Sequence, residues 1–147
     1  MLYGAETWQA SAATLKKTDM FHAKSLRRIE GLRWSDFVSN EKLRQLTKQS
    51  WFSTQAAERT LRWFGHLLRM PPHLPAKMIY DFDPIKVGWK RPRGRPKKRW
   101  SDSLSEFLAM ANIRQGEEQI LAMDRSGWRR QTSLSTPSSA QQETYVK

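Results

Sequence analysis

The stretch STQAAERTLRWFGHLLRMPP, residues 53–72, carries the strongest structural signal in the sequence. Its apolar residues recur every three or four positions, which places them on one face of an α-helix. Ser53 or Thr54 can cap this helix, because a hydroxyl oxygen accepts a bond from an N–H in the first turn. Two prolines follow Met70 and should end the helix there, since proline has no N–H to donate. The predicted apolar face consists of Ala57, Leu61, Phe64, Leu67 and Leu68.

Similar patterns predict other helices on both sides of this one. The predicted fold class is therefore all-α: a small irregular helical domain, interrupted by an extended basic loop and followed by a disordered C-terminal tail. Residues 2–8 are expected to be extended. The other expected helices span 14–30 before Gly31, a short segment capped by Ser39 or Asn40, 76–82 after Pro75, a segment opened by Ser101 or Ser103, and 115–130, whose end is expected to fray or bend at Gly127.

Apolar residues recur at helical spacing within these segments. The helix over 14–30 is expected to present Leu15, Met20, Phe21, Leu26 and Ile29 on one face. In the C-terminal segments, the expected apolar positions are Leu104, Phe107, Leu108, Ala111, Ile120, Leu121 and Trp128.

These elements divide the chain into four parts. Residues 1–82 form a helical segment, 83–99 a basic loop, 100–130 a C-terminal helical pair and 131–147 a tail. The tail is rich in Ser, Thr, Gln and Pro and has few apolar residues, a composition typical of disordered segments.

The charge composition indicates which kind of molecule the protein binds. The 147 residues include 26 Lys and Arg against 14 Asp and Glu, which gives a net charge of +12. Such an excess favours polyanions. The chain has no cysteine, no apolar run of about 20 residues and no signal-peptide pattern at its start. We therefore expect an intracellular, cationic protein without a membrane partner.

The densest cationic segment is Lys90-Arg91-Pro92-Arg93-Gly94-Arg95-Pro96-Lys97-Lys98. The prolines disfavour a helix, and Gly94 lets the backbone approach its ligand closely. The Pro-Arg-Gly-Arg-Pro core resembles the AT-hook, a minor-groove motif of architectural chromatin proteins. Arginine is attracted to the narrow minor groove of A·T-rich DNA.

This segment supplies the predicted nucleic-acid-binding site. Arg93 and Arg95 are expected to enter a minor groove or clamp a hybrid backbone, and Trp89 is the best candidate for a stacking contact. The residues expected to neutralise phosphates are Lys90, Arg91, Lys97, Lys98 and Arg99.

The tryptophans and the helical arginines each have a structural and a functional interpretation. Trp63, Trp100 and Trp128 are expected to be core anchors, with a base-stacking surface as the alternative. Several arginines predict either a solvated helix face or a polyanion site: Arg27, Arg28, Arg33, Arg59, Arg62 and Arg69.

The sequence contains no recognisable catalytic constellation. His22, His66 and His73 lack the spacing of a helical metal site. Asp81 and Asp83 favour a turn or cap over a metal site. A phosphate-binding glycine loop and a nucleophile elbow are also absent from the sequence. We therefore expect a protein that is not an enzyme and has no metal or cofactor.

An ordered series of sequence blocks extends over nearly the whole chain up to residue 130: Leu2–Trp8, Arg27–Trp34, Ser39–Glu41, Arg62–Met70, Gly94–Trp100 and Met123–Arg129. It resembles the C-terminal region of the endonuclease and reverse-transcriptase polyprotein of non-LTR (LINE-type) retrotransposons. The resemblance implies a nucleic-acid-handling segment after a missing polymerase domain, with DNA, RNA or a primer–template as partner. The polymerase Tyr-x-Asp-Asp box and the endonuclease motifs are absent from the sequence.

Two other interpretations stay open. The chain is either a helical protein-interaction module whose basic loop is a docking or nuclear-import signal, with an import receptor as partner, or a non-functional truncated element copy. Binding to nucleic acid and import both lead us to expect a nuclear, or nuclear and cytoplasmic, location.

Overall fold

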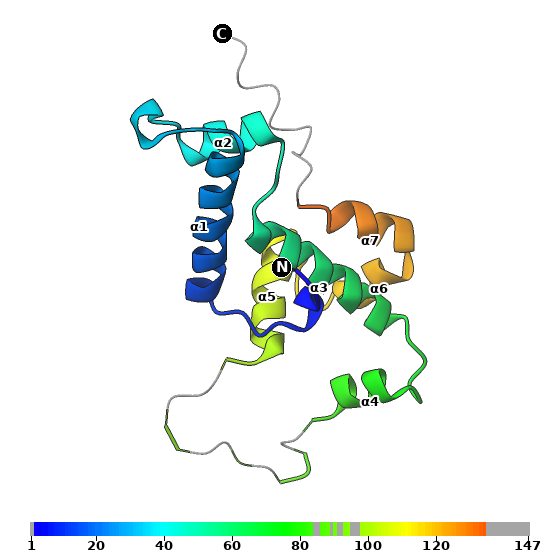
Figure 1. Cartoon of the computed structure of the whole chain (residues 1–147). Helices are drawn as coiled ribbons and strands as arrows, with labels where there is room; N and C mark the ends of the chain where they lie inside the picture. Colours follow the sequence, from blue (N-terminus) through cyan, green and yellow to red (C-terminus); the bar gives the residue numbers. More distant parts are fainter. Residues whose placement is uncertain (1, 84–85, 89, 91–92, 95–97, 135–147) are drawn as a thin grey trace.

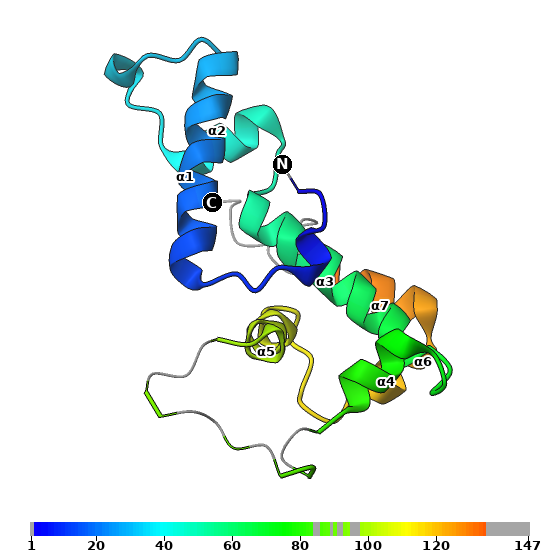
Figure 2. The ribbon, with the colours of Figure 1, turned by 60° about the horizontal axis from the view of Figure 1, so that its bottom comes forward.

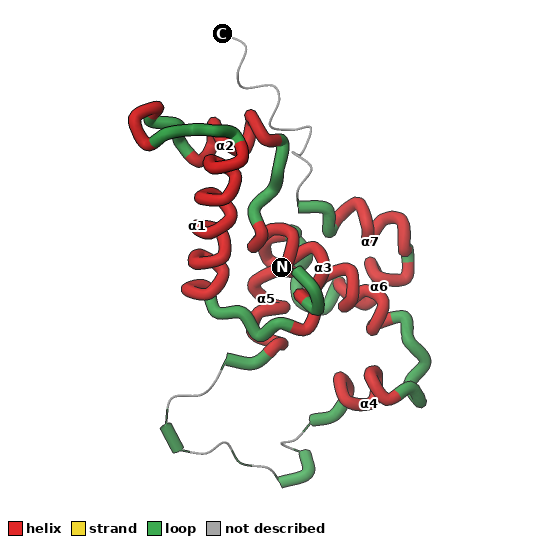
Figure 3. The backbone as a smooth tube through the Cα atoms, in the orientation of Figure 1, coloured by secondary structure: helices red, strands yellow, loops and turns green. Residues whose placement is uncertain are grey.

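A computed structural model describes residues 2–83, 86–88, 90, 93–94 and 98–134. Over these residues the chain is helical and contains no β-strand, which confirms the all-α fold class (Figure 3). None of the described helices is long and apolar enough to cross a membrane. The elements, where η denotes a 3-10 turn, are η1 (Ala5–Thr7), α1 (Ala12–Ile29), η2 (Trp34–Asp36), α2 (Asn40–Thr47), α3 (Phe52–Leu68), α4 (Pro75–Asp81), α5 (Trp100–Met110), α6 (Glu118–Met123) and α7 (Arg125–Gln131).

Helix α3 lies at the centre of the molecule (Figure 1). It contacts η1, α1, α4, α5, α6 and α7. The predicted apolar face of this helix is confirmed, because all five of its residues are buried. Together with buried residues of α5, α6, α7 and the α5–α6 connection they form the main core: Ala57, Leu61, Phe64, Leu67, Leu68, Leu104, Phe107, Ala111, Ile113, Ala122 and Trp128.

Within this core, Gly65 packs directly against Trp128. The indole Nε1 of Trp128 donates to the Leu61 carbonyl oxygen at 3.0 Å, and the side chain is 2% exposed. A Cβ at Gly65 would overlap the indole ring. A glycine inside a helix costs about 1 kcal/mol relative to alanine. Here it leaves room for the tryptophan that joins α7 to α3.

A second, smaller core joins α1 to α2. Ala23, Leu26 and Leu43 are buried in it, and Leu32, Val38 and Trp51 pack against it. Ser39 caps α2 as predicted, because its side chain accepts from Lys42 N at 3.2 Å. We call residues 12–47, which comprise α1, η2 and α2, the outer hairpin. Figures 1 and 2 show its η2 end projecting away from the main core.

The predicted face of α1 is wrong in part. Met20, Phe21 and Ile29 are exposed, whereas His22 and Ala23 are buried beside Leu26. The reason is that polar groups on the inner face have specific partners. His22 stacks on Phe52 with ring centroids 3.9 Å apart and an interplanar angle of 3°.

Asp19, on the same face of α1, accepts a hydrogen bond from the backbone N–H of Ser53 at 2.9 Å. Helix α3 therefore begins at Phe52 and receives a carboxylate from a neighbouring helix, not the predicted Ser53 or Thr54 cap. An acidic group in this place is favourable, because the first turn of a helix has N–H groups without partners and a partial positive charge.

Two further expectations at the ends of the chain are wrong. Residues 2–8 contain the η1 turn, which Gly4 permits with a φ of 65°. The helix expected over 115–130 is two helices, because Asp124 caps α7 by accepting from Ser126 N at 3.0 Å. Gly127 does not bend the chain; a Cβ there would overlap the Asp124 carboxylate.

The C-terminal boundary also differs from the prediction. Gln131 is the last residue of α7, and Thr132 is 4% exposed. Residues 131 and 132 of the predicted tail therefore belong to the folded part of the chain, and residues 135–147 lie outside the described residues.

One tetrapeptide, Arg-Trp-Ser-Asp, occurs twice, at Arg33–Asp36 and at Arg99–Asp102. In both copies the arginine backbone N–H donates to the aspartate Oδ2 at 2.7 Å. This bond opens η2 in the first copy and α5 in the second. We call these two segments the RWSD turns.

Candidate nucleic-acid interface

The structure describes five of the nine predicted site residues. Lys90, Arg93, Gly94 and Arg99 are exposed, and Lys98 is half-buried. The other four predicted residues lie outside the described part: Trp89, Arg91, Arg95 and Lys97. The described residues of 83–99 contain no helix or strand, as predicted for the basic loop.

Gly94 has a backbone conformation that explains the glycine. Its φ is +113°, a value that residues with a side chain rarely adopt. No described atom lies within 4 Å of the position a Cβ would take. Gly94 therefore serves the path of the backbone and leaves an open face on the loop.

Lys98 and Arg99 are fixed by helix α5. The Lys98 ammonium lies 2.8 Å from each carboxylate oxygen of Glu106. Arg99 takes part in the second RWSD turn through its backbone N–H. Its side chain is exposed, so the guanidinium is available to solvent. Lys98 has a carboxylate partner that a phosphate would have to replace, whereas no described contact engages the side chains of Lys90 and Arg93.

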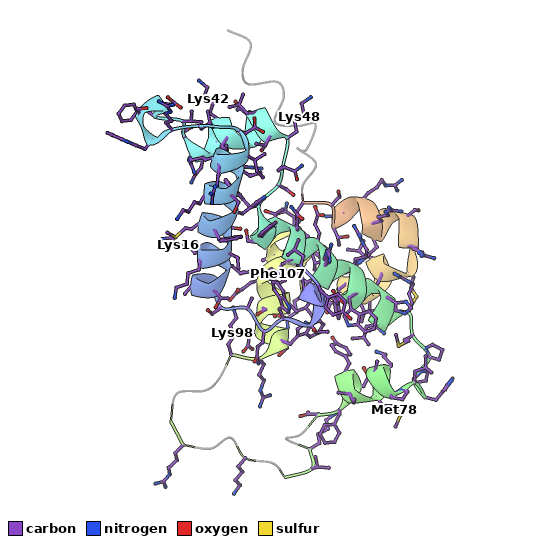
Figure 4. All side chains as sticks on the ribbon, viewed as in Figure 1. Lys16, Lys42, Lys48, Met78, Lys98 and Phe107 are labelled. Carbon is purple, nitrogen blue, oxygen red and sulfur yellow. The ribbon has the colours of Figure 1, made fainter. Side chains whose placement is uncertain are left out.

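Helix α3 holds both sides of the basic loop. The loop connects α4 to α5, and both of these helices contact α3 (Figure 2). Both ends of the loop are therefore attached to helices that pack on α3. In Figure 4, Lys98 lies at the start of α5, where the chain leaves the loop.

A shallow hollow of about 420 Å³ lies on the exposed side of α3. Arg59, Arg62, Trp63 and His66 come from successive turns of the helix, and Glu6 of η1 completes the rim. The rings of Trp63 and His66 are 5.5 Å apart and tilted by 51°. The hollow thus combines two guanidinium groups with an aromatic surface, the elements of a site for nucleic-acid bases and phosphates.

The N-terminal segment forms this rim because three side chains hold its backbone carbonyls. Arg59 donates to the Leu2 oxygen at 2.7 Å, Thr60 to the Ala5 oxygen at 3.4 Å and Trp100 to the Glu6 oxygen at 2.9 Å. Sequence reasoning missed Glu6, because it lies more than 50 positions from the other residues of the hollow and no local pattern signals the contact.

Trp63, Trp100 and Trp128 do not all have the same role, because two of them are core anchors and one lies at the surface. Trp128 is buried in the main core and Trp100 packs against it, so both are anchors as expected. Trp63 is half-buried and lines the hollow. It is the one of the three placed for a stacking contact.

The helical arginines are of two kinds. Arg27, Arg59 and Arg69 each donate to a backbone carbonyl, at 3.1, 2.7 and 2.6 Å, and so hold chain segments together. The side chains of Arg28 and Arg62 are exposed. The sequence did not distinguish these two groups, since both occur on amphipathic helices.

The titratable groups considered for metal binding do not form a cluster. Asp81 accepts from Lys77 Nζ at 2.8 Å at the end of α4. Burial lowers the pKa of His22, and the nearby Asp19 opposes that shift in part. No group of three His, Asp or Glu residues within the described part is placed to hold a metal ion.

The comparisons with known proteins give one relationship. The chain is similar to an uncharacterized, transposon-derived protein of Caenorhabditis elegans, with 26% identity over 136 residues. The match covers 87% of this chain and 48% of that protein, so the chain spans about half the length of this relative. The similarity fits a transposable-element origin. No protein-family model and no solved structure matches the chain.

Proposed function

We propose that this chain is a non-catalytic, nucleic-acid-binding part of a non-LTR retrotransposon reverse transcriptase. It would contact target DNA or the RNA/DNA template through the basic loop and the Arg- and Trp-bearing face of α3. The similarity to a transposon-derived protein supports the origin, and the resemblance of the ordered sequence blocks supports the element type.

The observation that carries this proposal is the unbalanced positive charge. With 26 Lys and Arg against 14 Asp and Glu, twelve cations remain even if every carboxylate is paired. Arg93 and Arg99 on the loop and Arg62 on α3 are exposed. Binding to a phosphate backbone would release counterions from it, which is a strong driving force.

The experiment is a fluorescence-anisotropy titration of the chain with A·T-rich duplex, G·C-rich duplex and RNA–DNA hybrid at several salt concentrations. If about five to seven phosphates are contacted, the slope of log affinity against log salt should be roughly −4 to −6. A slope near zero would remove the electrostatic mechanism. Absence of binding at moderate salt would favour the docking or nuclear-import signal instead.

Two double variants with equal charge loss test the loop. Arg93→Ala with Arg95→Ala should weaken binding to A·T-rich duplex more than Lys97→Ala with Lys98→Ala does. Arginine suits the narrow minor groove, and Lys98 already has Glu106 as a partner. Equal losses from both variants would leave only a nonspecific basic loop.

A further inference from the structure

The η2 end of the outer hairpin presents two large aromatic rings to solvent. Trp34 is 86% exposed and Phe37 is 83% exposed. Their centroids lie 6.1 Å apart with an interplanar angle of 75°, so the rings meet in a T-shaped contact. Such a contact occupies at most one face of each ring. At least one broad aromatic face is therefore open.

The segment that carries these rings is held in a defined conformation. Arg33 N donates to Asp36 Oδ2 at 2.7 Å, and Arg27 donates to Val38 O at 3.1 Å and to Asn40 Oδ1 at 2.6 Å. These bonds tie the turn to both helices of the hairpin. The open rings are thus presented on a preorganised support, which lowers the entropy lost on binding.

Phe37 adopts a left-handed conformation, with a φ of 47°. For a bulky residue this conformation is uncommon and costs on the order of 1 kcal/mol or more. The cost is not repaid by burial, because the Phe37 ring is exposed. An unfavourable backbone that directs an aromatic ring into solvent is a feature of binding sites more than of packing.

The charges around the rings indicate what the site binds. Residues 24–48 contain seven Lys and Arg against three Asp and Glu. Arg28, Arg33 and Lys42 are exposed near the turn in sequence, and Figure 4 shows Lys42 on α2, the helix that follows the turn. Protein interfaces are depleted of lysine but enriched in arginine, so among these cations it is the lysines that disfavour a protein partner. Aromatic rings among cations are the arrangement that binds single-stranded nucleic acid, because bases stack on the rings and phosphates pair with the cations.

We infer that Trp34 and Phe37 form a stacking platform for unpaired bases of a single-stranded DNA or RNA segment. This inference rests on the proposed function and adds a second contact, specific for unpaired strands. It lies apart from the basic loop, at the far end of the outer hairpin (Figures 1 and 2).

The test compares Trp34 variants in their affinity for an unstructured single-stranded oligonucleotide and for a blunt duplex. Trp34→Leu keeps an apolar side chain but removes the ring, so single-strand affinity should fall about 5- to 100-fold while duplex affinity stays within about twofold. Trp34→Phe should retain most of the single-strand affinity. Ile29→Ala is the matched control, because Ile29 is an exposed apolar residue without a ring beside the same turn; it should leave both affinities unchanged.

Several results would overturn the inference. Unchanged single-strand affinity of Trp34→Leu would do so while the proposed function stands, and so would equal losses for single strand and duplex. Self-association that Trp34→Lys abolishes, with nucleic-acid affinity unchanged, would assign the rings to a second copy of the chain. Failure of the unaltered chain to bind either oligonucleotide at low salt would count against the proposed function itself.

Discussion

The two RWSD turns place the same tryptophan in opposite environments. Trp100 packs against the main core, donates its indole N–H to the Glu6 oxygen at 2.9 Å and meets the Phe64 ring edge-on at 6.3 Å. Trp34 meets only an exposed ring, that of Phe37 at 6.1 Å, among the described residues, and it is itself 86% exposed. Their local geometry is nonetheless the same, since Arg33 and Arg99 have φ, ψ of −92°, 159° and −99°, 165°.

The residues after each turn explain why the second turn continues into helix α5, whereas η2 ends at Asp36. After Asp102 come Ser103 and Leu104, both buried, and the apolar spacing continues through α5. After Asp36 come Phe37 and Val38, and then Ser39, which caps α2 and so begins a new helix. Four residues set the turn, and the following sequence decides whether it becomes a helix.

The comparison therefore separates local conformation from burial. The aspartate bond forms wherever the tetrapeptide occurs, whereas burial of the tryptophan requires η1 and α3 beside it. This difference gives one copy a structural role in the main core. It leaves the other with an open ring, which the stacking inference uses.

Replacing each tryptophan by alanine should give the largest contrast. Trp100→Ala removes a ring that packs on the main core and the donor to Glu6, so the free energy of unfolding should fall by about 2–4 kcal/mol. Trp34→Ala should change it by no more than about 0.5 kcal/mol, because the ring is in solvent. Urea denaturation followed by circular dichroism measures both. Equal losses would mean that the outer turn is buried in solution.

Replacing the two aspartates should give a smaller effect, located in the turn. Asp102→Ala removes the acceptor for Arg99 N at the start of α5 and should reduce stability by roughly 1 kcal/mol. Asp36→Ala removes the equivalent bond from a three-residue turn outside the main core and should reduce global stability less.

Amide hydrogen exchange distinguishes the local effect from the global one. Both variants should expose their own arginine amide, that of Arg99 or Arg33, to faster exchange. Asp36→Asn and Asp102→Asn are the controls, since an amide oxygen can still accept the bond. If Asp36→Ala leaves the Arg33 amide protected, the two turns are not equivalent and the comparison fails.

The sequence predicted those parts of the fold that depend on residues close together in the chain. The apolar face of α3 follows from spacing, Ser39 from its hydroxyl as a cap, and the start of α4 from Pro75 in the first turn. The inner face of α1 could not be predicted in this way. Its Asp19 and His22 have the polarity of surface residues, and only contacts with Ser53 and Phe52 account for their inward position.

The same limit applies to the candidate site. The sequence indicated the cations of residues 90–99, because charge density and proline are visible in one segment. It did not indicate the hollow, which joins Glu6 to Trp63 across the chain. It also did not rank Trp34 above Trp100, because the two lie in identical tetrapeptides and differ only in what surrounds them.

The two regions should also differ in their response to acid, and this is the smallest expected effect. Burial holds the pKa of His22 below its ordinary value of 6.5 in the folded outer hairpin, although Asp19 opposes the shift. Its Nδ1 has no hydrogen-bond partner in the described structure. Opening of the hairpin therefore takes up a proton below pH 6.5. The stabilising contribution is complete above that pH and is lost as the pH falls from 6.5 towards the folded pKa.

In α7, which packs on the main core, the corresponding loss should come only at lower pH. Hydrogen bonds from the Ser126 hydroxyl and the Gly127 backbone lower the pKa of Asp124, so its contribution persists until the pH falls below its ordinary value of 3.8. Between pH 7 and pH 5, hydrogen-exchange protection factors should therefore fall in α1 near His22 and stay constant in α7. His22→Phe keeps a ring against Phe52 but cannot bind a proton, so it should remove the pH dependence in α1. If protection in α1 declines equally in this variant, a group other than His22 makes the outer hairpin the acid-sensitive region.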